Sequence, residues 1–398
     1  MVDAAAVELG RWEAGARGGP DSLGKAAEAC AWAVRELVGF AGLRVLLERA
    51  ADMRAAVRRL GDAIRGFEGV LDREAASFGP EDVERLNADL TRLKDSHFTL
   101  RADRLGNLDR VRALAGQSRD AGVLRAAYDL NVALNGLERL EVRGRDSAGI
   151  HVLARGRFEG VLTELADELD RRLHIEHFTH GAVRRLRGGE GLSLVYKVAA
   201  EVGELGDNIR FLREELCRDE LLRRVAGAAG AELIVVGHTR WASIGVIHEA
   251  NAHPVNQEEG EPSGGPDWVA ALNGDVDNFR DLTAEEGLRL PAPVTTDAKV
   301  IPVLLSRACA GGQDPAEAFR RVVNRFEGSV AVAAQTAAAP DHLYLALRGS
   351  GQALYVGLAA GTYVVASEPY GFVEEASTYL RLDGATPADP ARPASPGQ

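Results

Sequence analysis

The sequence predicts an α+β protein whose first part is helical and whose second part consists of antiparallel sheets with helices packed on them. Up to about residue 137, apolar residues recur at spacings of three and four, as on one face of a helix. After Glu232 the chain changes to short β-branched runs separated by turn residues. Runs of short strands joined by turns are typical of antiparallel sheets flanked by helices.

The helical character of the first part is clearest between residues 80 and 100. Pro80, followed by Glu81 and Asp82, favours a helix start because proline fits the first turn and carboxylates face the positive end of the dipole. An apolar seam follows at spacings of three and four: Val83, Leu86, Leu90, Leu93, His97 and Leu100. Such a seam predicts lengthwise packing on another helix. That helix belongs either to a partner, as in a coiled coil, or to this chain, as in a helical hairpin.

A second helical stretch is predicted from Phe158 to Ala228, divided near Gly188-Gly189, because it contains the amphipathic segment LVYKVAAEVGELGDNIRFLREELCRDELLRRV. Seven strands are predicted after it: ELIVVG, DWVAALNG, SVAVAAQT, HLYLALR, ALYVGL, TYVVAS and TYLRL. Helices are predicted among them at Thr296–Ala310 and Pro315–Phe326. The final residues, 383–398, are rich in proline and predict a linker or tail.

The composition disfavours several classes of function. The chain of 398 residues is 46% hydrophobic and can bury a sizeable core, but no apolar run reaches the roughly 18 residues needed to cross a bilayer. The formal net charge of −12 disfavours a nucleic-acid partner, which requires clustered positive charge. Three well-separated cysteines form no disulfide framework, and no basic-then-apolar leader follows Met1. We therefore expect a cytoplasmic protein with neither nucleic-acid nor membrane partners.

Neither a metal nor a cofactor is expected. The segment HIEHFTH contains His174, His177 and His180, but this spacing turns the third imidazole away from the helix face that the first two share. The chain contains neither a strand–glycine–helix dinucleotide fingerprint nor a phosphate-binding loop.

Five short motifs occur in a fixed order along the chain. They are RLEVRGRDSAGI at Arg139–Ile150, GHTRWASIG at Gly237–Gly245, Asn251-Ala252-His253-Pro254, Ala271-Leu272-Asn273-Gly274 and Thr295-Thr296-Asp297. Each motif alone has an ordinary structural explanation. An Asn-Gly pair is often a hairpin turn, and an aspartate before a helix is often a cap. The order of the five carries more information than any one of them.

Together these motifs resemble the glutaminase domain of class II, N-terminal-nucleophile glutamine amidotransferases, specifically the glutamine-fructose-6-phosphate transaminases. The resemblance covers roughly residues 137–150 and 232–382. It implies a four-layer α-β-β-α fold with large helical additions and with its first strand missing. The implied domains are a helical region at 1–137, a glutamine amidotransferase type 2 domain at 138–382 with a helical insertion at about 156–230, and the tail 383–398. The implied activity is hydrolysis of glutamine to supply ammonia for glucosamine 6-phosphate synthesis.

The resemblance also implies roles for individual residues. Arg240 binds the α-carboxylate of glutamine, since a guanidinium is a two-pronged donor, and Asp297 binds the α-ammonium group. Asn273 and Gly274 form the oxyanion hole, with Gly274 also contacting substrate. The alternatives are a surface ion pair for Arg240 and a helix cap for Asp297.

Three further residues have roles in the same resemblance. Ser243 contacts the substrate, where the family usually has threonine. Trp241 gates an ammonia passage, unless it is a core aromatic residue. Arg143 steadies the nucleophile, unless it forms an ion pair with Asp146.

The sequence departs from the family in several places. Histidines usual in the family are replaced by Ile244 and Leu272, and a glutamate by Lys299, which we expect on the helix exterior. The largest departure is at the start, where the family has a nucleophilic cysteine after the initiator and this chain has Val2-Asp3-Ala4. We interpret Cys30, Cys217 and Cys309 as buried helical residues.

These departures lead to two expectations about function. The chain is either an amidotransferase domain truncated of its N-terminal cysteine and its C-terminal sugar isomerase domains, and inactive by itself, or a catalytically inactive glutamine-binding or helical interaction module. The expected partners are glutamine and, through the missing domains, fructose 6-phosphate. A homodimer is compatible with the resemblance.

Overall fold

The computed structural model describes residues 1–13, 20–74, 77–186, 191–199, 204–242, 244–260, 265–349 and 351–382. The chain divides into two compact units, Met1–Arg112 and Ala113–Gln398, each of which has its own core. The boundary therefore lies about 25 residues before the predicted one at 137/138, because the last long helix before the sheets belongs to the second unit.

The first unit is a bundle of helices. They are α1 (Val2–Glu13), α2 (Pro20–Glu36), α3 (Gly39–Glu74), α4 (Pro80–Phe98), a π-helical turn (Thr99–Arg104) and the start of α5 (Leu105–Ala115). The predicted helix start at Pro80 is confirmed. Leu86, Leu90 and Leu93 of the predicted seam are buried, and α4 packs against α2 and α3 of the same unit. The seam thus packs within the chain, as expected of a helical hairpin.

The second unit contains eleven strands among the residues that the structure describes. They are β1 (Ser147–Arg155), β2 (Val183–Arg185), β3 (Gly191–Ala199), β4 (Glu232–Arg240), β5 (Val255–Asn256), β6 (Trp268–Gly274), β7 (Val330–Thr336), β8 (Tyr344–Arg348), β9 (Tyr355–Ala359), β10 (Thr362–Ala366) and β11 (Tyr379–Arg381). They form three sheets with the strand orders β2-β3-β1-β4, β5-β6-β7-β8 and β10-β9-β11, here called sheets A, B and C. Every described pairing is antiparallel.

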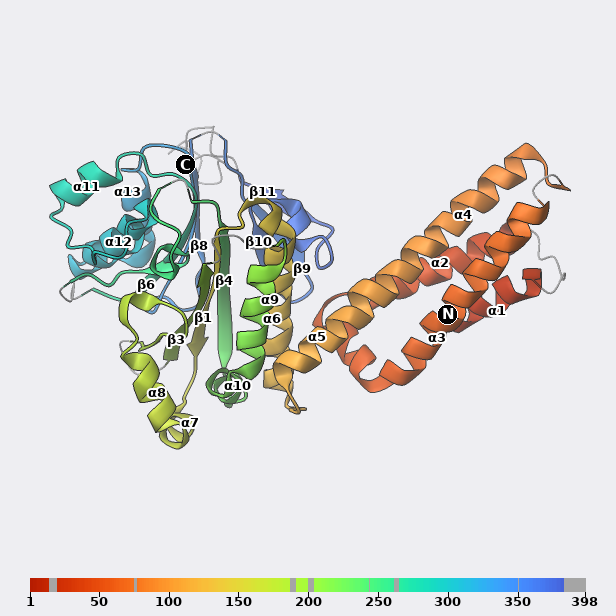
Figure 1. Cartoon of the computed structure of the whole chain (residues 1–398), viewed down its shortest axis with the longest axis horizontal. Helices are drawn as coiled ribbons and strands as arrows, with labels where there is room; N and C mark the ends of the chain where they lie inside the picture. Colours follow the sequence, from red (N-terminus) through yellow and green to blue (C-terminus); the bar gives the residue numbers. More distant parts are fainter. Residues whose placement is uncertain are drawn as a thin grey trace. The chain divides into compact units, whose positions relative to one another are not determined.

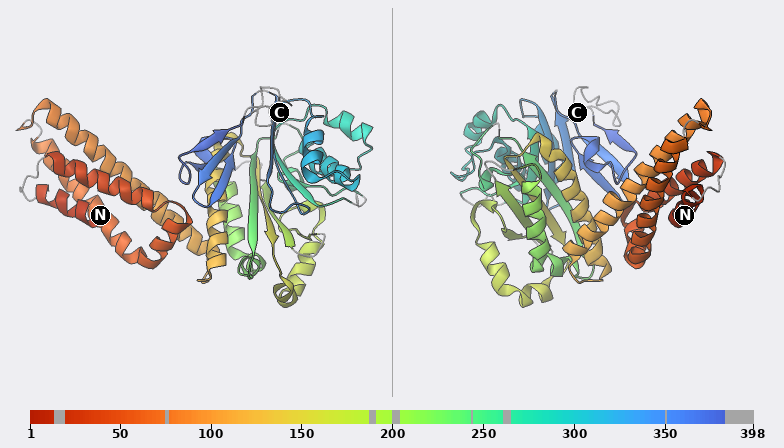
Figure 2. Two further views of the ribbon diagram at one scale, coloured as in Figure 1. Left: turned by 180° about the vertical axis from the view of Figure 1, so that it is seen from behind. Right: turned by 45° about the vertical axis from the view of Figure 1, so that its right-hand side comes forward.

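Helices cover the outer faces of sheets A and B. The helices of this unit are α6 (Ala121–Leu140), α7 (Glu159–Glu164), α8 (Ala166–Leu173), α9 (Asp207–Arg218), α10 (Glu220–Ala226), α11 (Phe279–Glu285), α12 (Val300–Ala310) and α13 (Pro315–Val323). Figure 1 shows α6 and α9 beside β4 and β1 of sheet A, and α12 and α13 on the far side of sheet B. Figure 2 shows the same order of layers from behind.

The two central sheets contact each other through their inner faces. Val195 of sheet A and Val269 of sheet B belong to one buried apolar cluster with Phe178. In addition, the side-chain amide of Gln335 on β7 hydrogen-bonds the imidazole of His151 on β1. The four-layer α-β-β-α order expected from the resemblance is therefore confirmed.

A larger apolar core lies between sheet B and its helices. Trp268, Leu272 and Val332 of the sheet pack with Ile301 and Leu304 of α12. All five side chains are at most 3% exposed. This core fixes the ends of β6 and the start of α12, the two places where candidate site residues occur.

The seven strands predicted after Glu232 and the two helices predicted among them are all confirmed to within a few residues. The prediction of a helical stretch over 158–228, divided near Gly188-Gly189, is wrong in its middle part, because Val183–Arg185 and Gly191–Ala199 are strands. Residues 191–197 are all buried, since β3 lies between β2 and β1 with both faces covered. Such a strand lacks the alternation of apolar and polar residues that distinguishes a strand from a helix in the sequence. For β1, no strand was predicted.

The expectation that Lys299 faces the helix exterior is also wrong. Its side chain is 2% exposed, and its Nζ donates to the backbone carbonyl of Asn256 at 2.7 Å. Among the residues that the structure describes, no helix is both long and apolar enough to cross a membrane.

Candidate active site

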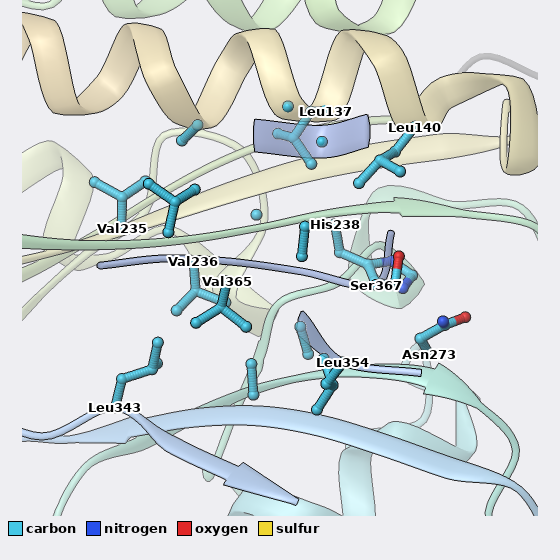
Figure 3. Close-up of a pocket in the computed structure, with 18 of the residues that line it drawn as sticks. Leu137, Leu140, Val235, Val236, His238, Asn273, Leu343, Leu354, Val365 and Ser367 are labelled. Carbon is cyan, nitrogen blue, oxygen red and sulfur yellow. The ribbon is translucent and has the colours of Figure 1, made fainter. Parts of the chain in front are cut away.

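A cavity of about 680 Å³ is lined by residues of all three sheets and of α6. Its lining includes six of the seven residues to which the resemblance assigns a role: Arg143, Arg240, Trp241, Asn273, Gly274 and Asp297. The seventh, Ser243, lies outside the described residues. Figure 3 shows Asn273, His238 and Ser367 at one end of this cavity, which we call the polar end.

Arg240 is the last residue of β4 and is held there by the register of the strand, which pairs Arg240 with Ser147 of β1. The residue is 4% exposed, so the alternative of a surface ion pair is wrong. Its Nη2 donates to the carbonyl of Ile244, but its buried Nη1 has no hydrogen-bond partner. Burial lowers the pKa of the guanidinium, and the nearby carboxylates of Asp297 and Asp146 oppose that shift. One guanidinium nitrogen therefore has unused hydrogen-bonding capacity.

The loop that follows Arg240 is fixed by Asp146, for which no structural role was predicted beyond the alternative ion pair with Arg143. Its Oδ2 accepts the backbone N–H of Ala242 at 2.8 Å. Arg143 instead pairs with Glu368, at 2.7 Å between Nη1 and Oε1. The alternative of an ion pair between Arg143 and Asp146 is thus wrong.

Asp297 lies at the start of the 3₁₀ turn that leads into α12, and it is 4% exposed. Its Oδ2 accepts the backbone N–H of Val276, which is 21 positions away in the chain, at 2.8 Å. The carboxylate therefore does more than cap its own helix. Burial raises the pKa of Asp297, while the N–H of Val276 opposes the shift.

His253 determines which group the hydroxyl of Thr296, the residue before Asp297, donates to. Burial lowers the pKa of its imidazole well below the usual value, so the ring is neutral near pH 7. Nδ1 lies 3.1 Å from the carbonyl of Leu272, to which it must donate, which leaves Nε2 to accept the Thr296 hydroxyl at 3.0 Å. Because a hydroxyl has one proton, Thr296 cannot also donate to Asp297, whose Oδ1 is 3.3 Å away. Oδ1 thus keeps its capacity to accept from a ligand.

Asn273 and Gly274 end β6 opposite β7, where Asn273 pairs with Ala331. They do not form a hairpin turn, because the chain continues from Gly274 toward α11. Gly274 has φ +103°, and a Cβ there would lie 1.8 Å from the carbonyl oxygen of Ser329. Both the backbone conformation and the close approach therefore require glycine.

Trp241 is 70% exposed, so the alternative of a core aromatic residue is wrong. The three cysteines lie in α2, α9 and α12, as expected, and none lines the cavity. Cys30 is buried, which raises its thiol pKa to about 11, whereas Cys217 and Cys309 are only partly buried. The described residues therefore place no thiol next to Asn273.

Gly149 and Asn251 contribute to the site without having been predicted to do so. A Cβ on Gly149 would lie 2.3 Å from the carbonyl oxygen of His253, so glycine allows β1 to approach that segment. Asn251 accepts the backbone N–H groups of Thr295 and Thr296 at 2.7 and 3.1 Å through its Oδ1. Both residues lie within the five motifs, so the sequence places them near the site, but it does not predict their contacts.

Comparisons with known proteins agree with the resemblance seen in the sequence. No family model matches the chain. The chain is 34% identical over 257 residues to a glutamine–fructose-6-phosphate aminotransferase (isomerizing) of Streptomyces coelicolor, which covers 64% of this chain and 32% of that protein. The enzyme of the same name from Thermococcus kodakarensis is 30% identical over 255 residues, covering 63% and 32%. The chain thus spans about a third of the length of the curated relatives it matches.

Among solved structures, glutamine phosphoribosylpyrophosphate amidotransferase from B. subtilis aligns with a TM-score of 0.40 and 20% identity, over 63% of this chain and 41% of that one. A structure named as the allosteric regulatory enzyme of purine biosynthesis aligns with the same TM-score and identity.

Proposed function

We propose that this chain, which over about 64% of its length is a homologue of glutamine–fructose-6-phosphate aminotransferases, provides the glutamine site of a glutamine amidotransferase. The observation that carries the proposal is the polar end of the cavity. There, a buried guanidinium with an unpartnered Nη1 and a buried carboxylate line the same cavity as Asn273 and Gly274.

Free glutamine is a zwitterion, and the two buried charges match its two charged groups. Arg240 would bind the α-carboxylate through Nη1, and Asp297 the α-ammonium group through Oδ1. Each charge-assisted contact typically contributes about 1.5 to 3 kcal/mol. Held in this way, the side-chain amide of glutamine would extend toward Asn273 and Gly274, whose N–H groups would stabilise the negative oxygen formed when the amide is attacked.

In this proposal the attacking group is the thiol of an N-terminal cysteine, activated by its own α-amine, as the resemblance implies. The described residues place no thiol at the cavity. A polypeptide of the printed sequence is therefore expected to bind glutamine without hydrolysing it. We propose further that the ammonia is destined for fructose 6-phosphate, by analogy with the names of the relatives. A cytoplasmic location and a homodimer remain part of the proposal on the resemblance alone.

Calorimetric titration of the printed polypeptide with glutamine tests the proposal. We expect saturable binding of L-glutamine and at least tenfold weaker binding of D-glutamine, whose side-chain amide would point away from Asn273 and Gly274 when both charged groups are bound. Arg240→Lys should weaken binding at least tenfold, because an ammonium group cannot reproduce the guanidinium fork. The matched control is Arg155→Lys, at the opposite end of the β1–β4 pair. Equal effects of the two substitutions, or no binding at all, would refute the proposal.

Ammonia release separates binding from catalysis. We expect none above background from the printed polypeptide. Turnover that persists after Cys30, Cys217 and Cys309 are all replaced by serine would show that the nucleophile has been wrongly identified.

A further inference from the structure

Lys197 is a buried lysine between the two central sheets, and it does not line the cavity of the candidate site. On β3 its side chain points to the same face as that of Val195, two positions earlier, which packs against sheet B. The register pairs Lys197 with Gly149 of β1, and a Cβ on that glycine would lie 3.2 Å from Cγ of the lysine. The absence of a side chain at Gly149 therefore leaves room for the stem of the lysine.

The Nζ of Lys197 has no hydrogen-bond partner within the described part of the chain. It lies 5.6 Å from the ring centre of Phe178, whose face attracts a cation but supplies no oxygen or nitrogen acceptor. Burial and the charge of Lys299 lower the pKa of Lys197 to about 7, although the carboxylates of Glu249 and Glu258 oppose the shift. A large share of this side chain is therefore a neutral amine at pH 7, with a free lone pair.

The other three lysines of the chain lie in different surroundings. Lys25 is exposed on α2. Lys94 donates to Glu68 at 2.7 Å, which raises its pKa and keeps it protonated. Lys299 is buried, but its Nζ donates two hydrogen bonds, at 2.7 and 3.2 Å. Of the four lysines, all of which the structure describes, only Lys197 is both buried and without a hydrogen-bond partner for its amine.

Lys299 is the basic group that acts on Lys197 from the side of sheet B. Two basic groups close together in a buried region destabilise each other's charged form. The nearby carboxylate of Glu258 is already paired with Arg184, so it is shared among several cations. The Nζ of Lys299 has three protons and uses two of them on oxygens of Asn256, so a third can bind an added oxygen. A negative group attached to Lys197 would therefore find a partner in Lys299.

We propose that Lys197 is a modification site for carbon dioxide, which its Nζ binds covalently as a carbamate. The lone pair of Nζ forms a bond to the carbon of CO₂, one C=O electron pair moves onto oxygen, and one N–H proton leaves to solvent. The balance is R–NH₂ + CO₂ → R–NH–COO⁻ + H⁺. Because CO₂ is small and uncharged, it reaches a buried amine without the desolvation cost of a charged reagent.

The carbamate accepts a hydrogen bond from Lys299 and so joins β3 of sheet A to the start of α12, which packs on sheet B. It replaces two mutually unfavourable basic groups by an ion pair. The proposal does not depend on the proposed function, because neither lysine lines the cavity and the reaction requires no glutamine.

Nuclear magnetic resonance of the whole printed polypeptide tests the proposal. The four lysines carry ¹⁵N at Nζ, and the protein is equilibrated with ¹³C-labelled CO₂ and bicarbonate at pH 7. We expect one carbamate carbon signal, split by the directly bonded ¹⁵N. The α-amino group is unlabelled, so a carbamate formed there is not split. An unsplit signal alone, as from bicarbonate bound without a covalent bond, or no protein-bound signal, would overturn the proposal.

Variants and chemical trapping identify the lysine. Lys197→Met should remove the split signal, whereas the matched control Lys94→Met should leave it unchanged. Lys299→Met should weaken the signal at least fivefold at the same CO₂ pressure, and Lys299→Arg should restore it, because the carbamate needs a cationic partner. Survival of the signal in Lys197→Met would overturn the assignment.

Trapping needs no variant and keeps the test valid if Lys197→Met unfolds. A trialkyloxonium reagent converts a carbamate into a stable ester, which mass spectrometry of peptides from the unmodified chain should locate on Lys197. An ester found only on Lys25, Lys94 or Lys299 would refute the proposed site.

Discussion

Arg240 and Asp297 are both charged residues in surroundings that disfavour charge. Burial lowers the pKa of the guanidinium and raises that of the carboxyl group, so each is shifted toward its neutral form. Each is partly offset by contacts within the chain, through Ile244 and Val276 respectively. A zwitterionic ligand would supply the remaining compensation to both residues at once. If the proposed function is right, this pairing would favour a free amino acid over a simple anion.

Glutamine binding should depend on the ionisation of Asp297. The pKa of this carboxyl group is raised in the folded chain, and the ammonium contact requires the ionised form. Binding is therefore complete above the raised pKa and is lost as the pH falls through it, at a higher pH than for an ordinary aspartate. Calorimetric titrations from pH 7 to pH 4 measure the effect. Asp297→Asn should bind weakly at every pH, whereas Asp281→Asn, exposed in α11, should behave as the parent.

Gly274→Ala should destabilise the chain more than an ordinary glycine replacement. The new Cβ would meet the Ser329 carbonyl, and φ +103° is strained for alanine. The matched control is Gly361→Ala, with φ +74° and nothing within 4 Å of the added Cβ. Its cost should be only the conformational strain of about 1 kcal/mol, whereas Gly274→Ala should cost roughly 3 kcal/mol or more. Urea unfolding of both variants measures the difference, and equal costs would contradict the close approach.

At the scale of elements, strands can be predicted from the sequence where they are short, have one buried face or are bounded by turn residues. The runs after Glu232 are short, β-branched and bounded by turn residues, so their prediction succeeded. β3 is central and covered on both faces, so its sequence lacks the alternation of apolar and polar residues from which a strand is predicted. The buried position of Lys299 could not be predicted because its partner, Asn256, is 43 positions away and becomes a neighbour only in the fold.

The candidate site shows the same limit. The resemblance carried by the five motifs implies that Arg240, Asn273 and Asp297 belong to one site, and all three line the same cavity. The contacts that set their chemistry cannot be predicted from the motifs. The hydrogen bond from Val276, the neutral ring of His253 and the loop anchor at Asp146 all depend on tertiary packing between separate elements.

The contact between the two central sheets should weaken in acid. His151 bridges β1 to Ser193 of β3 at 2.7 Å and to Gln335 of β7, and burial lowers its pKa to about 3. Because the folded pKa lies below the unfolded value of about 6.5, this group's stabilisation is present above pH 6.5 and is lost as the pH falls toward 3. The full effect is on the order of 5 kcal/mol.

Urea unfolding at pH 7, 5.5 and 4 isolates this effect by comparison with a variant. His151→Gln should be less stable than the parent at pH 7 but should lose less stability on acidification. His342→Gln, in an exposed position, should show the parental pH dependence. If His151→Gln and the parent lose stability in parallel, the imidazole is not responsible.

At the scale of the whole molecule, each of the two units has its own apolar core. The first unit buries residues such as Leu23, Leu60 and Leu93 among its own helices. The second unit contains all three sheets and every described residue of the candidate site. The resemblance also leaves the first unit outside its range, and no described residue of that unit lines the cavity of the candidate site.

A polypeptide of residues 113–398 should therefore fold and bind glutamine by itself. The wall of the cavity that a helix provides comes from α6, which lies after the boundary and starts with its own cap, since Asp120 accepts the N–H groups of Gly122 and Val123. We expect an affinity within about twofold of that of the full chain, because no group proposed to bind glutamine is removed. Calorimetric unfolding should lose one transition and keep the other within a few degrees, as for independent domains. Loss of glutamine binding in this fragment, while Arg240→Lys still weakens binding in the full chain, would show that the helical bundle supports the site.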